Sequence, residues 1–457
     1  MDPSQPMDPN KTVAAGGDLL RTQAMTGPPI GDPNRTSAMG AMRALTAEVI
    51  PGRQATLANG PAREQFLLEL RAIGSALPGA VVQAGRSPLN LCLVLDRSGS
   101  MEGAPLEYAK QACRYVVDLL SPNDVLSIVT FEEVVDVLMP PQRVTSKEPI
   151  KEGIGRLQVG NTTNLYDGIA LAAQQLSAFN EPGRATRMIV LSDGDPTAGI
   201  KDFATLVSYA GEIKSRGITC TFLGFGPDYN EELIAGMAKK AGGNYYYIPS
   251  PELLPEVFRT ELEKLMTVVA RNLQLKMNLA RWVNLRAATG QSVPSGEREF
   301  TLALADLERG ATIQQVFDLD FPNHPLGWYR VASGLLTYDD SSTSGTETID
   351  VDFVMEFTSE AARYSVPVDP RVAQAAEIAA ASRTVERTIM GLKSGAITHQ
   401  GAIGELQKTQ ALLLRDGRTA EAQEVTMALR ALQQGDRGQA EKTLMGTVVQ
   451  LDQGKKT

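Results

Sequence analysis

The chain has 457 residues, 43% of them hydrophobic, and a formal net charge of −9 at pH 7. This length suits about three domains with hydrophobic cores, and without a run of about 18 consecutive apolar residues a membrane span is not expected. The negative net charge argues against unspecific binding to nucleic acids. The first residues lack the basic and apolar regions of a secretory signal, so we expect a cytoplasmic protein built from several soluble domains.

Residues 1–44 are rich in Pro, Gly, Met, Asn and Thr and have no sustained apolar period, which predicts a disordered tail. Within this tail three threonines directly follow a basic residue: Thr12, Thr22 and Thr36. They resemble the threonine motifs of bacterial signalling proteins that serine/threonine kinases phosphorylate and forkhead-associated domains then recognise. A phosphate there would create a docking point for arginines of a partner. The alternative is a tail that only aids solubility and repeats by chance.

Residues 45–86 are predicted to supply the first strands of a β-sandwich. Apolar residues alternate with polar ones over Leu45 to Ile50 and over Gln65 to Ile73. This period of two is typical of strands that bury one face.

Strands and helices alternate between residues 87 and 266. Apolar runs predict buried strands at 89–95, 125–131, 188–191, 219–225 and 244–248. Helices are predicted at 106–120, after Asn164, and at 203–216, 231–241 and 252–269. The alternation predicts an α/β fold with a doubly wound, mostly parallel sheet that helices cover on both faces.

Three polar loops follow strands or open helices of this sheet. The first is Asp96-Arg97-Ser98-Gly99-Ser100, the second runs from Gly160 to Gly168, and the third runs from Ser192 to Thr197. In open α/β sheets the ligand site lies beyond the carboxyl ends of the strands. Carboxylate and hydroxyl oxygens are hard donors, which suit a hard cation such as Mg²⁺.

Together these loops resemble the metal-ion-dependent adhesion site (MIDAS) of von Willebrand factor type A (VWA) domains, of the bacterial cytoplasmic type, over roughly residues 87–266. The resemblance implies a Rossmann-like fold and a metal ion surrounded by Asp96, Ser98, Ser100, Thr163 and Asp193. Mg²⁺ is the expected cofactor, with Ca²⁺ and Mn²⁺ as alternatives. Thr162 stands beside Thr163 and leaves two registers open; the resemblance favours Thr163, because the family usually places the ligand directly before Asn.

The resemblance implies protein binding without catalysis. In the family the ion keeps an exchangeable position that an Asp or Glu of a partner fills, which predicts an interaction or scaffold module that is not an enzyme. A second hypothesis is a phosphothreonine-regulated adaptor whose tail a forkhead-associated domain reads. The weakest is a metal-dependent phosphohydrolase, because no second aspartate follows Asp96 where a phosphatase would need one.

The chain offers little for other metal or nucleophile chemistry. Its three cysteines, Cys92, Cys113 and Cys220, fall on predicted strands and a helix of one domain, where reduced and buried thiols are expected. Its two histidines, His324 and His399, lie far apart in sequence. A zinc site built on histidine and a Ser-His-Asp triad are therefore poorly supported.

Residues 267–368 are predicted to complete the β-sandwich. Short apolar-alternating segments between Val268 and Thr358 are separated by turns rich in Gly, Pro, Asp and Ser. Because similar segments precede residue 87, we expect the VWA domain, residues 87–266, to be inserted into the sandwich. Such an arrangement resembles that of inter-alpha-trypsin-inhibitor-like chains.

Residues 369–457 are predicted to form a helical C-terminal region. Helical periodicity runs over 372–392, 397–415, 419–433 and 439–451, with breaks at glycines. We expect about four helices that pack as a cap on the sandwich or on another copy of the chain.

Overall fold

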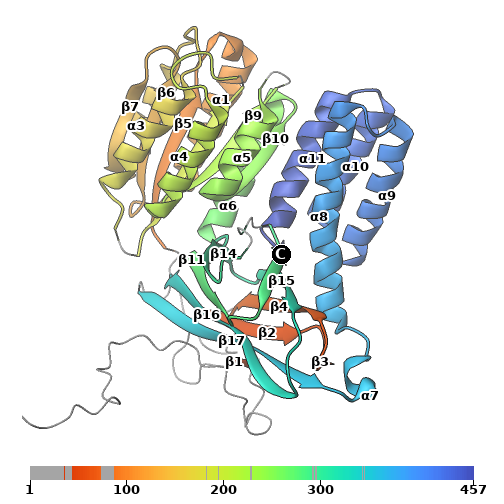
Figure 1. Ribbon diagram of the computed structural model, residues 1–457. Helices are drawn as coiled ribbons and strands as arrows, with labels where there is room; N and C mark the ends of the chain where they lie inside the picture. The colour runs from red at the N-terminus through yellow and green to blue at the C-terminus, as the bar shows by residue number, and fades with distance from the viewer. Residues whose placement is uncertain are drawn as a thin grey trace, which may run out of the picture.

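The computed structural model describes residues 35–36, 44–73, 87–181, 183–193, 195–226, 229–290, 293, 296–341, 343 and 345–456. These residues form a central α/β domain, two further sheets and a set of C-terminal helices (Figure 1). Within these ranges no helix is both long and apolar enough to cross a membrane.

The central sheet has the strand order β10-β9-β8-β5-β6-β7. All neighbouring pairs are parallel except β6 with β7. Its strands are β5 (Leu89–Asp96), β6 (Val125–Phe131), β7 (Asp136–Arg143), β8 (Ala185–Ser192), β9 (Thr219–Phe225) and β10 (Gly242–Ile248). β5, β6, β8 and β9 are buried at every position, as expected of parallel strands covered on both faces.

Helices cover both faces of this sheet and bury separate hydrophobic clusters. α1 (Ala104–Leu119), α2 (Lys147–Gly155) and α6 (Leu254–Met266) pack on one face. α3 (Leu165–Ser177), α4 (Phe203–Ser215) and α5 (Glu231–Ala241) pack on the other. The doubly wound fold predicted from the alternating pattern is thus confirmed. The closing helix is shorter than predicted, because Val268 already begins a strand.

The first additional sheet has the order β1-β2-β4-β15-β12, with β18 paired to β15. Its strands are β1 (Arg35–Thr36), β2 (Leu45–Pro51), β4 (Ala62–Ala72), β12 (Asn284–Ala288), β15 (Thr312–Phe321) and β18 (Lys455–Lys456). The sheet therefore joins segments from before and after the central domain.

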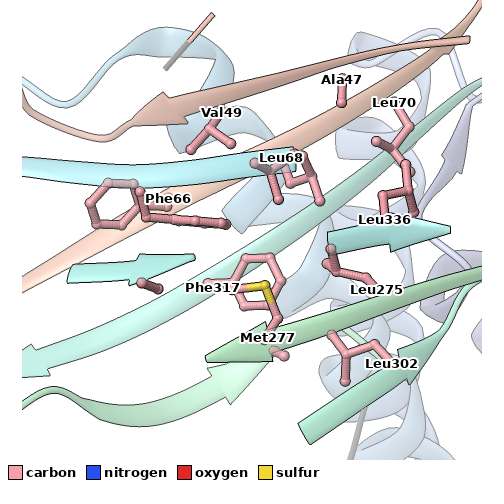
Figure 2. Packing of buried hydrophobic residues seen from close by; sticks show 14 of the residues in the cluster. Ala47, Val49, Phe66, Leu68, Leu70, Leu275, Met277, Leu302, Phe317 and Leu336 are labelled. Carbon is pink, nitrogen blue, oxygen red and sulfur yellow. The ribbon is translucent and has the colours of Figure 1, made fainter. Parts of the chain in front are cut away.

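The second additional sheet has the order β13-β11-β16-β17-β3, with β14 paired to β11. Its strands are β3 (Ala55–Leu57), β11 (Val268–Leu279), β13 (Glu299–Ala303), β14 (Leu307–Glu308), β16 (Gly327–Asp340) and β17 (Thr346–Thr358). Phe66, Leu68 and Phe317 of the first sheet and Met277 and Leu336 of the second belong to one buried cluster (Figure 2). The two sheets thus form a sandwich that the central domain interrupts, as the sequence predicted.

The C-terminal region contains α7 (Ala361–Tyr364), α8 (Pro370–Ser394), α9 (His399–Arg415), α10 (Thr419–Gln433) and α11 (Arg437–Asp452). α8 rests on the first sheet, where Val372 packs with Leu67 and Val316. α11 rests on the central domain, where Val449 joins the cluster of Tyr245. The helices therefore pack on the sandwich, as expected, and also on the central domain, which the sequence pattern did not indicate (Figure 1).

The tail predicted to be disordered over residues 1–44 includes a short strand. Arg35 and Thr36 pair antiparallel with Glu48 and Ala47 of β2. The outer edge of β2 offers backbone groups that an extended segment can pair with. Disorder of the tail stays a prediction, since most of residues 1–44 lie outside the described residues. Thr12 and Thr22 lie outside the described residues.

Candidate metal centre

The first loop begins where β5 ends, at the fully buried Asp96. One oxygen of this carboxylate, Oδ1, accepts a hydrogen bond of 2.9 Å from the backbone N–H of Ser98. This is the usual way in which an aspartate fixes the turn that follows it. The other oxygen, Oδ2, accepts a bond of 2.9 Å from the hydroxyl of Ser192, at the end of β8. Asp96 therefore ties two adjacent strand ends together.

The hydroxyls of the first loop converge on the carboxylate of the third. The Oγ atoms of Ser98 and Ser100 lie 3.1 Å apart. Ser98 Oγ donates to Asp193 Oδ1 over 3.2 Å, and Ser100 Oγ donates to the same oxygen over 2.9 Å. These contacts follow from the topology, since β5 and β8 are neighbours in parallel and their carboxyl ends meet at one edge. Ser98 and Asp193 are buried, whereas Ser100 is exposed to solvent.

The second loop is joined to the third through the backbone of Thr163. Its N–H donates to Thr197 Oγ1 over 2.9 Å, and its carbonyl accepts bonds from the N–H groups of Thr197 and Ala198 over 3.0 and 3.2 Å. Thr163 is buried, and the neighbouring Thr162 has a buried hydroxyl without a hydrogen-bond partner among the described residues. The structure thus brings all three loops to one edge of the sheet.

Electrostatics at this edge favour a cation. Burial and, to a smaller extent, the nearby charge of Asp193 raise the pKa of Asp96 to about 7, against the lowering effect of the hydrogen bonds from Ser98 and Ser192. A carboxylate in this position is costly to ionise unless a positive charge lies beside it. The donor set fits a hard divalent ion, because it combines carboxylate and hydroxyl oxygens.

Hydroxyl oxygens are essential to this donor set. In the part of the chain that the structure describes, no group of three or more His, Cys, Asp or Glu side chains could hold a metal ion. Carboxylates alone therefore do not build a site here, and serine and threonine would supply the remaining ligands.

Two further aspartates of the loops have other roles. Asp167 lies in the first turn of α3, where its N–H donates to Asn164 Oδ1 over 3.4 Å and its Oδ2 accepts from Asn164 Nδ2 over 2.7 Å. This reciprocal pair caps the N-terminus of α3. Asp195 is exposed. Sequence reasoning missed Ser192 and Thr197, although both stand in the third loop motif beside residues that it selected.

Residues 90–260 match the model of the von Willebrand factor type A domain. The Synechocystis protein sll0103 is 33% identical over 201 residues, which cover 44% of this chain and 47% of that protein, so the match spans less than half of the relative's length. Two solved structures match most of the chain in fold. They are a von Willebrand factor type A protein from Catenulispora acidiphila (TM-score 0.68, 17% identity, 86% of this chain and 92% of that one) and the ArnB paralog VWA2 from Sulfolobus acidocaldarius (TM-score 0.62, 17% identity, 90% and 98%).

The fold and these similarities define a protein that contains a VWA domain, the class commonly used as an adhesion or interaction module with a MIDAS. In this chain two additional sheets and the helices α8–α11 accompany the domain.

Proposed function

We propose that this protein binds a partner protein through a divalent cation held by Asp96, Ser98, Ser100, Thr163 and Asp193, with Mg²⁺ as the expected ion. The observation that carries the proposal is the convergence of two serine hydroxyls on one oxygen of Asp193, beside the buried carboxylate of Asp96. Hydrogen bonds hold these oxygens together at the carboxyl edge of the sheet.

A bound cation would supply a positive charge with a coordination position open to an oxygen of the partner. The neutral hydroxyls of Ser98 and Ser100 would orient the ion without cancelling that charge. Because Ser100 is exposed while Asp96 is buried, a partner would approach from the side of Ser100. The partner's own Asp or Glu is the complementary ligand.

Binding is favoured over catalysis because the serine hydroxyls donate to carboxylates, not to a histidine. Both histidines of the chain are engaged elsewhere. His324 stacks on Trp282 with ring centroids 3.7 Å apart, and His399 Nε2 lies 2.9 Å from the carbonyl of Leu432. Neither one can activate Ser98 or Ser100 as a nucleophile.

Calorimetric titration of the full chain with Mg²⁺ tests the first half of the proposal. We expect saturable Mg²⁺ binding for the wild type and for Asp195→Ala, which removes an exposed carboxylate of the third loop. Asp96→Ala should lose Mg²⁺ binding. Ser100→Ala is a second variant that changes only an exposed hydroxyl and should also weaken binding. Equal Mg²⁺ affinity in all four proteins would disprove the metal site.

Affinity capture from native lysate tests the second half. Partners should be retained by wild type and Asp195→Ala in Mg²⁺, and lost with chelator and with Asp96→Ala. If Mg²⁺ binds but capture is the same with and without chelator, the metal site exists but does not carry the interaction.

A further inference from the structure

A polar cavity lies at the end of the VWA domain opposite the metal loops, where the domain meets the sandwich. Its volume is about 260 Å³. One wall is formed by Arg184, Thr186 and Arg187 at the start of β8, and the other by Arg271 and Asn272 of β11. The cavity is therefore shaped by two domains together.

Arg271 is the unusual member of this lining. Only 4% of the residue is exposed, and its Nε has no hydrogen-bond partner among the described residues. Burial lowers the pKa of its guanidinium, and the charge of Arg187 lowers it further, although Asp306 and Asp339 act in the opposite direction. A buried donor without an acceptor is destabilising, so the Nε of Arg271 lacks compensation within the described residues.

Arg184 and Arg187 are neighbours of Arg271 in this lining and are held in place by the protein. Nη1 of Arg184 donates to the carbonyls of Leu89 and Asn123 over 3.1 and 2.8 Å. Arg187 donates to the backbone of Thr186 and forms a buried ion pair with Asp306. The Nε atoms of both arginines are nevertheless buried without hydrogen-bond partners in the described part of the chain.

Acidic groups lie around the cavity, but those in its lining are engaged or exposed. Asp339 accepts bonds of 2.7 Å from Asn272 Nδ2 and 2.9 Å from Thr346 Oγ1, so its oxygens are already occupied by neutral donors. Glu181 lies 3.7 Å from Arg184 Nε but is mostly exposed. A fourth arginine, Arg216, lines the rim and is half exposed. The described lining therefore holds four arginines and two carboxylates, while Asp306 and Glu212 pair with Arg187 and Arg216 from outside the lining.

We infer that this cavity, which we term the junction pocket, is a binding site for a small oxyanion that carries phosphate or carboxylate groups. Guanidinium groups form paired, charge-assisted hydrogen bonds with both kinds of anion. The volume lies just below the range of about 300–1,000 Å³ typical of sites for drug-sized ligands, so the occupant is a compact molecule. The inference does not depend on the metal site, which lies at the other end of β8.

Titration of the full chain in metal-free buffer tests the inference. The probes are inorganic phosphate, pyrophosphate and citrate at constant ionic strength, with chloride as the reference anion. We expect saturable binding of at least one probe and no effect of chloride beyond screening. Whether the phosphates or citrate bind more tightly identifies the chemical class. Because the buffer contains no metal ion, saturable binding there separates this site from the metal loops.

Three arginine variants complete the test. Arg271→Met, which keeps the length of the side chain without its charge, should weaken binding about tenfold or more. Arg216→Gln, at the half-exposed rim, should weaken it less and remains informative if Arg271→Met does not fold. Arg156→Gln, an exposed arginine on the far side of the domain, should bind like the wild type.

Two results would overturn the inference. One is the absence of saturable binding of every probe to the wild type. The other is equal affinity in the wild type, Arg271→Met and Arg216→Gln. In either case the junction pocket is a solvated joint between two domains, and Arg271→Met should then be as stable as the wild type or more stable.

Discussion

The two ends of the VWA sheet treat charge in opposite ways. At the carboxyl end, the charged group that shifts the pKa of Asp96 is a second carboxylate, Asp193, and the shift is upward. At the amino end, Asp306 is buried beside Arg187 and Lys214. Burial by itself would raise the pKa of Asp306, but these cations and the N–H of Asn272 lower it below its ordinary value.

This difference indicates which charge a ligand should carry at each end. The carboxyl end concentrates carboxylate and hydroxyl oxygens, and it faces away from the sandwich (Figure 1). The amino end has a surplus of arginines around the junction pocket and is anchored to the sandwich through β11. Under the two proposals a cation would complete the first arrangement and an anion the second, so variants that remove single charges should affect the two ends differently.

The largest effect is expected at the anchored end. Asp306→Ala should lower the free energy of unfolding by about 3–5 kcal/mol, because it leaves Arg187 and Lys214 buried without their carboxylate. Since the pKa of Asp306 is lowered, its contribution is complete at neutral pH and is lost only as the pH falls below its ordinary value of 3.8. Urea unfolding at pH 7 measures the loss.

Glu256→Ala is the matched control for Asp306→Ala. Glu256 pairs with Arg259 on the exposed surface of α6, and its removal should change the free energy of unfolding little, because solvent screens exposed ion pairs. If both variants lose equally little free energy of unfolding, the buried ion pair does not anchor the domain. The contrast between the two ends is then weaker than proposed.

The next effect concerns the metal loops. Asp193→Asn keeps the size of the side chain and removes one of the two negative charges, so the affinity for Mg²⁺ should fall about 100-fold, or roughly 2.7 kcal/mol. Its stability without metal should not fall, since the like charge beside Asp96 is gone. Calorimetry with Mg²⁺ measures the affinity, and urea unfolding in chelator measures the free energy of unfolding without metal. Asp202→Asn, at the exposed N-cap of α4, should leave Mg²⁺ affinity unchanged.

A third carboxylate tests whether burial or a missing cation sets these shifts. Glu424 of α10 accepts bonds from Thr447 and Gln450 of α11, and burial raises its pKa to about 7. The folded state therefore binds more protons than the unfolded state between pH 4.5 and 7, and stability should fall as the pH rises through this window.

Glu424→Gln should remove that slope. At pH 8 the variant should be more stable than the wild type by about 2 kcal/mol, after allowance for the partial exposure of the residue. At pH 4 the advantage should vanish. Thermal unfolding over this pH range measures the difference, and parallel curves for the two proteins would show that Glu424 does not titrate in this window.

Much of the fold could be predicted because its strands are long apolar runs. Leu89 to Leu95 and Val125 to Phe131 read as buried strands, and both are buried at every position. The sequence pattern did not indicate β7, an edge strand that contains Pro140 and Pro141 and is largely exposed. Prolines and exposure are tolerated at sheet edges and erase the usual pattern of a strand.

The metal loops and the junction pocket also differ in how far the sequence predicts them. The metal loops follow strands in short motifs, so Asp96 and Asp193 could be selected from sequence. The junction pocket has no motif, because its arginines come from β8, from the end of α4 and from β11, and only packing of the VWA domain on the sandwich brings them together. The Thr162 and Thr163 pair marks the limit of the motif itself, since one residue of register decides which hydroxyl faces the ion.

The smallest effect resolves that register. Thr163→Val keeps the shape of the side chain and removes one neutral ligand, so Mg²⁺ affinity should fall about tenfold, or 1.4 kcal/mol. Thr162→Val should leave the affinity unchanged and should not destabilise the fold, because its hydroxyl is buried without a hydrogen-bond partner within the described residues. If instead Thr162→Val loses Mg²⁺ affinity and Thr163→Val retains it, the hydroxyl of Thr162 is the ligand. The ligand of the second loop then lies one residue before the threonine that the motif selects.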